Sequence, residues 1–400
     1  MAQGPQGQTR IEGDEAVAVA AAVKERVRGV RAGEPLRAGA LTLVPLLPGG
    51  DAVDADGGEY LPLERALRDG LFQVTEQQQA TVPELLATST AAAPVILIGG
   101  EQVVGGLQNR VLNTTMLVAA GTTLRVPVTC VEQGRWSPAR HATVSGRPVM
   151  DVGDVTMGGA GREQQRQFTS DGAAYASLRR VHAKQVSESL SSGLGHRSDQ
   201  GAVWGEVSDR MARTASHSPT YAMDALYKEP ERATRLAEMT AALPRPAGAV
   251  GFVAVVGGEP VGAELFAGEA LAGAYWEKLA RSYALEALDA ERQGTVRGTF
   301  AGTEQQRLLD EALAAEIAVY ASPGLGHDAR LAGAKVAGAG LVHAGQVVHL
   351  SLFADDEADA TESPVEEQTE VEHTQSAEAP AQAQNRSPVA RVRRGPRVGA

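Results

Sequence analysis

One stretch, NRVLNTTMLVAAGTTLRVPVTCVEQGRW, contains two apolar runs joined by a short Ala-Gly-Thr turn over residues 109–136. Such runs are typical of paired β-strands. Because side chains alternate between the two faces of a strand, Arg110 and Leu112 share a face of the first run, and Cys130 and Glu132 share a face of the second. A hairpin centred on the turn places Leu112 opposite Cys130 and Arg110 opposite Glu132. A shift of one residue would separate the apolar faces, so the pattern favours this alignment.

Polar groups are dense where these apolar faces end, and this density predicts a binding site. The predicted site consists of Gln108, Asn109, Arg110, Asn113, Glu132, Gln133, Arg135 and Trp136. In this interpretation Arg110 and Arg135 bind an anion, Glu132 orients them, and the amide side chains of the set contact hydroxyl groups. The alternative is structural: Arg110 and Glu132 form an ion pair that closes the sheet edge, and Trp136 covers the hairpin.

The only cysteine of the chain, Cys130, shares a strand face with Leu124, Val126 and Val128. This position predicts a buried, unreactive thiol. A nucleophilic role is the alternative, and it requires a neighbouring base and partial exposure. A single cysteine also excludes an internal disulfide and fits a reducing compartment.

The composition excludes two classes of partner. A formal net charge of −12 argues against non-specific binding to nucleic acid. No run reaches the roughly 18 apolar residues that a membrane span needs. The first residues, MAQGPQGQTR, lack the basic-then-apolar order of an export signal. These features predict a cytoplasmic protein that binds neither membranes nor nucleic acid.

The chain divides into three parts, and the predicted fold class is α+β. Residues 1–37 predict an N-terminal arm, partly disordered, with a short helix. Residues 38–353 predict the main domain, which is rich in β-hairpins over 38–165 and mixes helices with further hairpins over 166–353. Residues 354–400 form an acidic block and then a basic one, which predicts a disordered tail. The tail either solubilises the protein or engages a protein partner.

Two similar segments, VILIGGEQVVGG (95–106) and VAVVGGEPVGAE (253–264), predict hairpins. In both, Gly-Gly supplies the positive φ angles of a tight turn. Glu101 and Glu259 follow these glycines, and they form an acid pair if the hairpins pack together; otherwise they are turn residues that face water. Further on, residues 268–293 predict a long helix whose Tyr and Trp stripe faces the core.

Familiar cofactor motifs are absent from the sequence. The eight histidines show neither H-E-x-x-H nor Cys-flanked spacing, so no metal site is predicted. The segment GLGHDA (324–329) fits the spacing of a dinucleotide-binding turn, but Pro323 interrupts the junction between strand and turn. No acidic residue follows about twenty positions later to bind a ribose. The sequence therefore identifies no cofactor.

Several blocks resemble a known family. GGEQVVGGLQNRVLNTTMLVAAG (99–121) and VPVTCVEQGRW (126–136) resemble the bacterial ARG and rhodanese-phosphatase-superfamily-associated protein domain. QGAVWGEV, GFVAVVGGEPVGAELF and LVHAGQVVHLSLF are similar to later parts of it, so the resemblance covers about residues 40–353. The family name records genomic association with ADP-ribosylglycohydrolases and rhodanese-like phosphatases. The resemblance therefore implies metabolism of ADP-ribose, NAD or phosphorylated nucleosides, and it assigns no catalytic residues.

Two functions stay open at this point. In the first, the protein binds or processes a phosphorylated nucleoside or ADP-ribose-type ligand at the predicted site. In the second, it is a non-catalytic interaction or regulatory protein that uses its sheet edge and charged tail. The sequence decides neither whether the chain is an enzyme nor which ligand it takes.

Overall fold

The computed structural model describes residues 9–50, 60–77, 83–135, 143–144, 147–148 and 168–355. All of them lie in Met1–Glu357, the first of two units into which the chain divides; the second is Ala358–Ala400. Helices are mixed with strands that pair almost entirely antiparallel, so the predicted α+β class is confirmed. The predicted tail lies outside the described residues from residue 356 onward.

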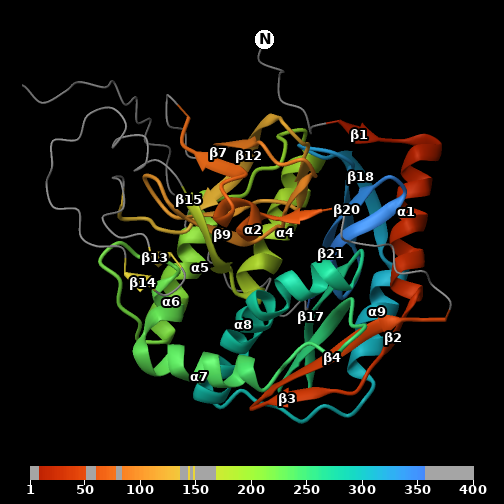
Figure 1. The fold of residues 1–400 in the computed structure, drawn as a ribbon. Coiled ribbons are helices and arrows are strands. Elements are labelled where there is room, and N and C mark those ends of the chain that lie inside the picture. Colours follow the sequence, from red (N-terminus) through yellow and green to blue (C-terminus); the bar gives the residue numbers. More distant parts are fainter. Residues whose placement is uncertain are drawn as a thin grey trace, which may run out of the picture. The chain divides into compact units, whose positions relative to one another are not determined.

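A ten-stranded antiparallel sheet is the largest element of the fold (Figure 1). Its strands follow one another in the order β1 (Arg10–Ile11), β18 (Glu316–Ala321), β19 (His327–Ala332), β20 (Val336–His343), β21 (Gln346–Ala354), β17 (Glu259–Phe266), β16 (Gly251–Val256), β4 (Leu41–Pro48) and β2 (Val30–Ala32), and β3 (Leu36–Ala38) also pairs with β4. Apolar and β-branched residues dominate strands such as LTLVPLLP in β4, as burial on both faces requires.

The segment predicted as an N-terminal arm takes part in this sheet. β1 pairs with β18, and both β2 and β3 pair with β4. The predicted helix is present as α1 (Gly13–Arg28), and it buries Val19, Val23 and Val27, which lie on one helical face. Residues 10–38 are therefore packed into the fold.

The two faces of the ten-stranded sheet differ in chemistry. On one face, α1 and α9 (Glu304–Ala314) cover an apolar layer that includes Leu350 and Leu352 of β21. Because side chains alternate along a strand, His349 and Ser351 point to the opposite face. That face contacts α4 (Ala176–Ser191) and α8 (Glu269–Gln293). It carries the buried polar groups of the site described below.

The β-rich segment contains further, smaller sheets (Figure 1). The six-stranded sheet has the order β15 (Phe168–Ala173), β9 (Glu101–Gly105), β10 (Arg110–Leu112), β12 (Thr123–Cys130), β7 (Glu84–Ser89) and β6 (Phe72–Thr75). The three-stranded sheet has the order β11 (Met116–Val118), β8 (Val95–Leu97) and β5 (Leu61–Pro62), the last of which leads into α2 (Leu63–Arg68). A two-stranded pair joins β13 (Thr143–Val144) to β14 (Arg147–Pro148).

The predicted strand NRVLNTTMLV is interrupted in the structure, and its two halves, β10 and β11, belong to different sheets. β10 does pair with β12, but Arg110 lies opposite Cys130 and Leu112 lies opposite Val128. The predicted pairing of Arg110 with Glu132 is therefore wrong by two residues. The predicted faces are kept, because a shift of two leaves the alternation unchanged.

The interruption has a local cause. The side chain of Asn113 donates a hydrogen bond to the backbone carbonyl of His196 at 2.8 Å. The hydroxyl of Thr115 accepts one from the backbone N–H of Gly99 at 3.0 Å. The backbone N–H of Asn113 still donates to the carbonyl of Pro127 at 3.0 Å. The chain leaves β12 after this residue and continues into β11, which pairs with β8.

The two Gly-Gly-Glu segments fold differently. β16 and β17 pair across Gly257 and Gly258, which confirms the second predicted hairpin. β8 and β9 lie in different sheets, so the hairpin predicted over 95–106 is wrong. Gly100 instead has a φ of +83°, and a Cβ there would lie 2.7 Å from Cγ of Arg179. This glycine lets the backbone pass closely over an arginine side chain.

We expect Gly100→Ala to lower the free energy of unfolding by about 3 kcal/mol, because it adds a steric clash to left-handed strain. Gly121→Ala is the matched control: φ is +66° there, and a Cβ would meet nothing within 4 Å. Strain alone costs about 1–2 kcal/mol. Urea denaturation of both variants checks this, and equal losses would show that the contact with Arg179 plays no part.

The long helix predicted over 268–293 is present as α8. Its aromatic stripe is buried as predicted, and Trp276 packs edge-on against Phe252 with ring centroids 4.9 Å apart. The helices between α4 and α8 are α5 (Gln200–Arg213), α6 (Ala225–Lys228) and α7 (Pro230–Ala241). Among the described residues, none of the helices combines the length and the apolar character that crossing a bilayer requires.

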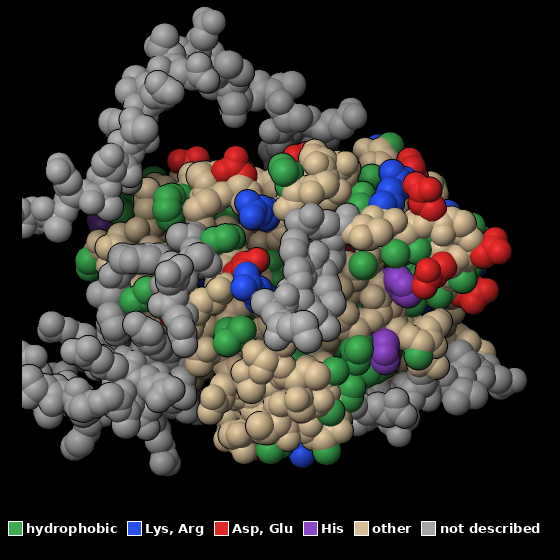
Figure 2. Space-filling model, turned by 90° about the horizontal axis from the view of Figure 1, so that it is seen from above, with side chains coloured by type: hydrophobic (Ala, Val, Ile, Leu, Met, Phe, Trp, Pro, Cys, Tyr) green, Lys and Arg blue, Asp and Glu red, His purple; other side chains and the backbone are tan. Residues whose placement is uncertain are grey.

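Hydrophobic side chains are scattered over the face shown in Figure 2, with acidic and basic side chains between them. The most exposed large hydrophobic residues of the described chain are Val17, Leu71, Leu194, Tyr221 and Val296. They come from segments far apart in the sequence. Singly exposed apolar side chains are ordinary and do not mark an interface.

Candidate functional site

Part of the predicted site assembles around the carboxylate of Glu132. Its Oε2 lies 2.7 Å from Nη2 of Arg135 and accepts the backbone N–H of Asn109 at 3.1 Å. Its Oε1 accepts the hydroxyl of Thr220 at 2.8 Å. The side chain of Gln108 donates to the Glu132 carbonyl at 2.9 Å. The prediction that the two ends of the quoted stretch lie together is confirmed for these residues.

These contacts favour a structural role for the Glu132 cluster, although its ion pair joins Glu132 to Arg135, where the sequence predicted Arg110. Burial raises the pKa of Glu132, but hydrogen bonds from Arg135 and Thr220 outweigh it and hold the pKa below its ordinary value. Arg135 also donates to the carbonyls of Gly105 and Gly106 and to the side chain of Asn109. Its guanidinium is thus occupied by groups of the protein itself.

Arg110 contacts a different carboxylate. It is wholly buried, and its guanidinium lies 3.7 Å from Glu76 and donates to Gln108 at 2.8 Å. The structure places Arg110 beside Glu76, whereas Arg135 contacts Glu132. Gln133 is exposed, and Trp136 lies outside the described residues.

The thiol of Cys130 is buried and protonated. Burial raises its pKa to about 11, and the nearby charge of Arg110 offsets this only in part. The thiol donates to Gln108 at 2.8 Å. Because the thiolate is the nucleophilic form, this environment agrees with the predicted unreactive thiol.

A different pocket lies against the polar face of the ten-stranded sheet, and two buried arginines line it. The lining of this arginine pocket consists of Gly99, Gly100, Asn113, Thr114, Thr115, Arg179, His182, Ala183, Arg330, Ala339, Ser351 and Phe353. The space between these residues is about 340 Å³ with its mouth included.

Strand register builds one wall of the arginine pocket. Arg330 of β19 lies opposite Ala339 of β20, Ala339 lies opposite Ser351 of β21, and Ser351 lies opposite Glu264 of β17. These four side chains form a row across the sheet on one face. The small side chain of Ala339 leaves room between the polar groups on either side.

The two arginines have donors that no described protein group satisfies. Arg179 and Arg330 are each 3% exposed. Nη1 of Arg179 lies 2.6 Å from Glu264, and Nη2 of Arg330 lies 2.6 Å from Asp328. Among the described residues, Nε of Arg179 and both Nε and Nη1 of Arg330 have no hydrogen-bond partner. A buried donor is costly unless it is bonded, so these atoms mark the place of an acceptor.

Glu264 is held as a carboxylate by four donors. They are Arg179 at 2.6 Å, Tyr283 at 2.8 Å, Ser351 at 2.8 Å and His349 at 3.1 Å. Burial raises its pKa, but the charge of Arg179 and the hydrogen bonds lower it to about 2. The carboxylate is therefore ionised at neutral pH.

Asp328 plays the same part for Arg330. It also accepts hydrogen bonds from Thr114 and His196, both at 2.8 Å. Burial raises the pKa of Asp328, but Arg330 and His196 outweigh it and hold the pKa well below its ordinary value. Each arginine charge is thus balanced by one carboxylate. Nη2 of Arg179 also donates to Ser351 at 3.1 Å, and Nη2 of Arg330 also donates to Thr114 at 2.8 Å. The donors without a described partner are therefore Nε of Arg179 and Nε and Nη1 of Arg330.

His182 adds a neutral polar group to the arginine pocket. Burial, together with the charge of Arg330, lowers its pKa to about 3. Thr129 donates to Asn113 at 2.8 Å, so Nε2 of His182 is the donor in its 3.1 Å contact with the Thr129 hydroxyl. The other ring nitrogen, Nδ1, is therefore an acceptor.

Most residues of this pocket lie outside the predicted site, since only Asn113 of the predicted set lines it. The missed signal is a charged or imidazole side chain inside an apolar strand. Glu264 lies in GAELF, His349 in VVHLSLF, and Asp328 and Arg330 in HDARLA. A strand buried on both faces tolerates such a residue only with a partner, so these positions could have been singled out.

Two other predicted residues have separate structural roles. Glu101 is wholly buried and lies 2.6 Å from Lys278, so its prediction as a turn residue facing water is wrong. Glu259 is exposed and lies 2.8 Å from Arg307. Within the part of the chain that the structure describes, no three His, Cys, Asp or Glu side chains are grouped to hold a metal ion.

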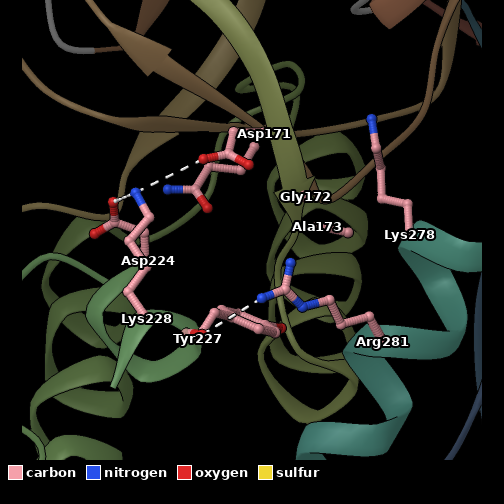
Figure 3. Close-up of a pocket in the computed structure, with 9 residues that line it drawn as sticks. Asp171, Gly172, Ala173, Asp224, Tyr227, Lys228, Lys278 and Arg281 are labelled. Carbon is pink, nitrogen blue, oxygen red and sulfur yellow. Dashed lines mark hydrogen bonds and ion pairs between the residues drawn. The ribbon is translucent and has the colours of Figure 1, made fainter. Parts of the chain in front are cut away.

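A second pocket lies between β15, α6 and α8, with Lys228 and Asp224 on one side and Arg281 on the other (Figure 3). Lys228 is paired with Asp224 at 2.6 Å. The hydroxyl of Tyr227 and Nε2 of Gln102 are buried there without a described partner. Its cationic side chains are engaged by protein groups, since Lys228 and Lys278 each pair with two carboxylates and Arg281 donates to the carbonyl of Tyr227. The arginine pocket offers charged donors that have no described partner, and it is the stronger candidate for an anion.

Comparison with known proteins gives one match. The model of a family described as the ARG and Rhodanese-Phosphatase-superfamily-associated Protein domain matches residues 29–353. No curated protein matches the chain, and no solved structure matches it.

Proposed function

This chain belongs to the ARG and Rhodanese-Phosphatase-superfamily-associated Protein domain family, and from that premise we propose a cytoplasmic protein that binds a phosphorylated nucleoside or ADP-ribose-type ligand in NAD-linked metabolism. The phosphoryl group binds in the arginine pocket and not in the Glu132 cluster. The observation that carries this proposal is the set of unpartnered buried donors on Arg179 and Arg330.

The chemistry of these donors suits a phosphoryl group. Two guanidinium groups line the pocket and hold N–H donors without a described partner, and a phosphoryl group has several oxygen acceptors to receive them. Glu264 and Asp328 occupy the other edges of the guanidinium groups and so fix their orientation. Neutral lining groups such as His182 suit the hydroxyls of an attached sugar. The size of the pocket leaves the rest of a nucleoside at its mouth.

The genomic association that the family name records supports the ligand class. ADP-ribosylglycohydrolases and phosphatases act on ADP-ribosyl groups and phosphate esters, and both kinds of molecule carry phosphoryl groups. A pocket with two forked cationic donors is a reasonable receptor for such a molecule.

Calorimetry with inorganic phosphate, AMP and ADP-ribose tests the proposal. We expect Arg330→Lys to weaken binding about tenfold or more, because lysine keeps the charge beside Asp328 but lacks the forked donors. Arg135→Met is the matched control, since Arg135 belongs to the Glu132 cluster, and it should leave the affinity unchanged.

Three outcomes count against the proposal. The unaltered chain could bind none of the ligands, Arg330→Lys could bind as well as the unaltered chain, or Arg135→Met could abolish binding while Arg330→Lys does not. The last result would return the site to the Glu132 cluster. Circular dichroism of each variant confirms that it is folded.

The alternative function, a non-catalytic interaction or regulatory protein, stays a prediction. Most of the tail that it relies on lies outside the described residues. No particular contact among residues 9–355 that the structure describes favours it.

A further inference from the structure

The hydroxyl of Thr115, which lines the arginine pocket, contacts the imidazole of His349, and this imidazole in turn contacts the carboxylate of Glu264. Oγ1 of Thr115 lies 3.0 Å from Nδ1 of His349, and Nε2 of His349 lies 3.1 Å from Glu264. Oγ1 of Thr115 also accepts the backbone N–H of Gly99 at 3.0 Å. Because an ionised carboxylate only accepts, the proton of the neutral imidazole is on Nε2. Nδ1 therefore accepts the O–H of Thr115.

We propose that Thr115 is the nucleophile of a phosphoryl-transfer reaction in the arginine pocket, with His349 as its general base and Glu264 as the residue that positions the base. The nucleophile is thus hydrogen-bonded to the base, and the base is hydrogen-bonded to the carboxylate that orients it. This inference rests on the proposed function, because the pocket must first bind a phosphate ester.

Neither of two neighbouring threonines has such a base. Thr114 donates its hydroxyl to the carboxylate of Asp328, which Arg330 keeps ionised. Thr129 donates to the amide oxygen of Asn113, which does not take up a proton. Among these three hydroxyls, only that of Thr115 donates to an unprotonated imidazole nitrogen.

The surroundings of His349 suit a base whose charge appears only during the reaction. The ring of Phe266 stacks on the imidazole with centroids 4.5 Å apart, which fixes the plane of the ring. Glu264 stabilises the imidazolium, and its other donors, Arg179, Tyr283 and Ser351, keep it from moving. Such a preorganised environment lowers the cost of moving a proton into a buried site.

The reaction has two balanced steps. Thr115 Oγ1 attacks phosphorus, a Thr–O–P bond forms, and the P–O bond to the alcohol breaks. The Thr115 proton passes to Nδ1 of His349, and the alkoxide, which departs on the opposite side of phosphorus, takes a proton from solvent at the pocket mouth. Water next attacks the same phosphorus from that side, releases a proton to solvent and breaks the Thr–O–P bond, and the proton on His349 returns to Thr115. The net change is a phosphate ester and water giving an alcohol and phosphate. Arg179 and Arg330 face the negative charge on the phosphoryl oxygens throughout.

A small alkyl fluorophosphonate tests this without knowledge of the substrate. Attack by Thr115 forms an O–P bond, breaks the P–F bond and releases fluoride, while the proton goes to His349. Intact-protein mass spectrometry should detect one adduct per chain, and peptide mapping should place it on Thr115. Thr115→Ser should be labelled. Thr115→Val, which has nearly the same shape, should be labelled at least about 100-fold more slowly.

Thr240→Val is the matched control, because Thr240 is buried in α7, its hydroxyl donates to the backbone carbonyl of Leu236, and it does not line the pocket; it should be labelled like the unaltered chain. Absence of an adduct on the unaltered chain, or an adduct that persists in Thr115→Val, overturns the inference. Phosphate binding measured on the same samples separates the two proposals. Binding without labelling rejects the nucleophile and keeps the binding function. Labelling without binding shows a reactive hydroxyl at Thr115 but rejects the binding function and, with it, the phosphoryl-transfer reaction.

Discussion

Glu264→Gln is expected to lower the free energy of unfolding by about 3–5 kcal/mol, because it removes the counter-charge of Arg179 inside the core. Both side chains are almost wholly buried, so water does not replace the lost partner. The new amide N–H₂ also faces hydrogen-bond donors such as Ser351 or His349, where the carboxylate had accepted. Urea denaturation at neutral pH measures the loss.

Glu259→Gln is the matched control for this experiment, because it makes the same chemical change on the same strand, β17. Glu259 and its partner Arg307 are each more than half exposed. Exposed ion pairs contribute about 0–1 kcal/mol, so this variant should unfold almost as the unaltered chain does. Similar losses in the two variants would contradict the central role of the buried Glu264 network.

Stability is also expected to fall as the pH drops from about 6.5 to about 4.5, because burial lowers the pKa of two histidines, His182 and His349. Burial lowers the pKa of His182 from 6.5 to about 3, so the unfolded state binds the proton more strongly than the folded state. The free energy of unfolding is therefore not changed by the titration of this histidine above pH 6.5, and it decreases progressively as the pH falls from 6.5 toward 3. One proton corresponds to about 1.4 kcal/mol per pH unit, or about 2–3 kcal/mol over this window.

His182→Gln should reduce the pH dependence between 6.5 and 4.5, because glutamine can keep a hydrogen bond to Thr129 and does not titrate. The part that remains belongs to His349, whose pKa burial also lowers. The contribution of Glu264 begins to be lost only below 4.5, because its pKa is lowered from that value to about 2. Urea denaturation at a series of pH values checks this. The control His217→Gln changes an exposed histidine and should follow the unaltered chain. An unchanged slope in His182→Gln would assign the acid sensitivity to another group.

Local patterns in the sequence predicted several elements of the fold. The 3.6-residue period of the segment over 268–293 predicted α8 and its buried stripe, because a helix with one wide apolar face packs that face inward. Strand alternation predicted the shared face of Arg110, Leu112, Val128 and Cys130. It could not predict the register of β10 against β12, because a shift by two residues preserves every face.

The candidate site was predictable only in part. The segment from Gly99 to Thr115 was the most specific block of the family resemblance, and it supplies nearly half of the pocket lining. The Gly-Gly pair at 99–100 predicted a hairpin turn. Glycine is used both in turns with positive φ and where the backbone approaches another group closely, and the sequence does not distinguish these two uses. What the pair approaches is Arg179, which is far away in the sequence.

The sequence by itself determined which side chains share a face and which segments form helices, because both depend on spacing between near neighbours. The tertiary structure decided which charges meet. Glu264, Ser351 and Arg330 lie in one row only because their strands are neighbours in the sheet. The order of these strands is β17, β21, β20 and β19. Arg179 then reaches that row from α4. Cross-strand pairing between distant segments is set by the packing of the whole core, and no local pattern contains it.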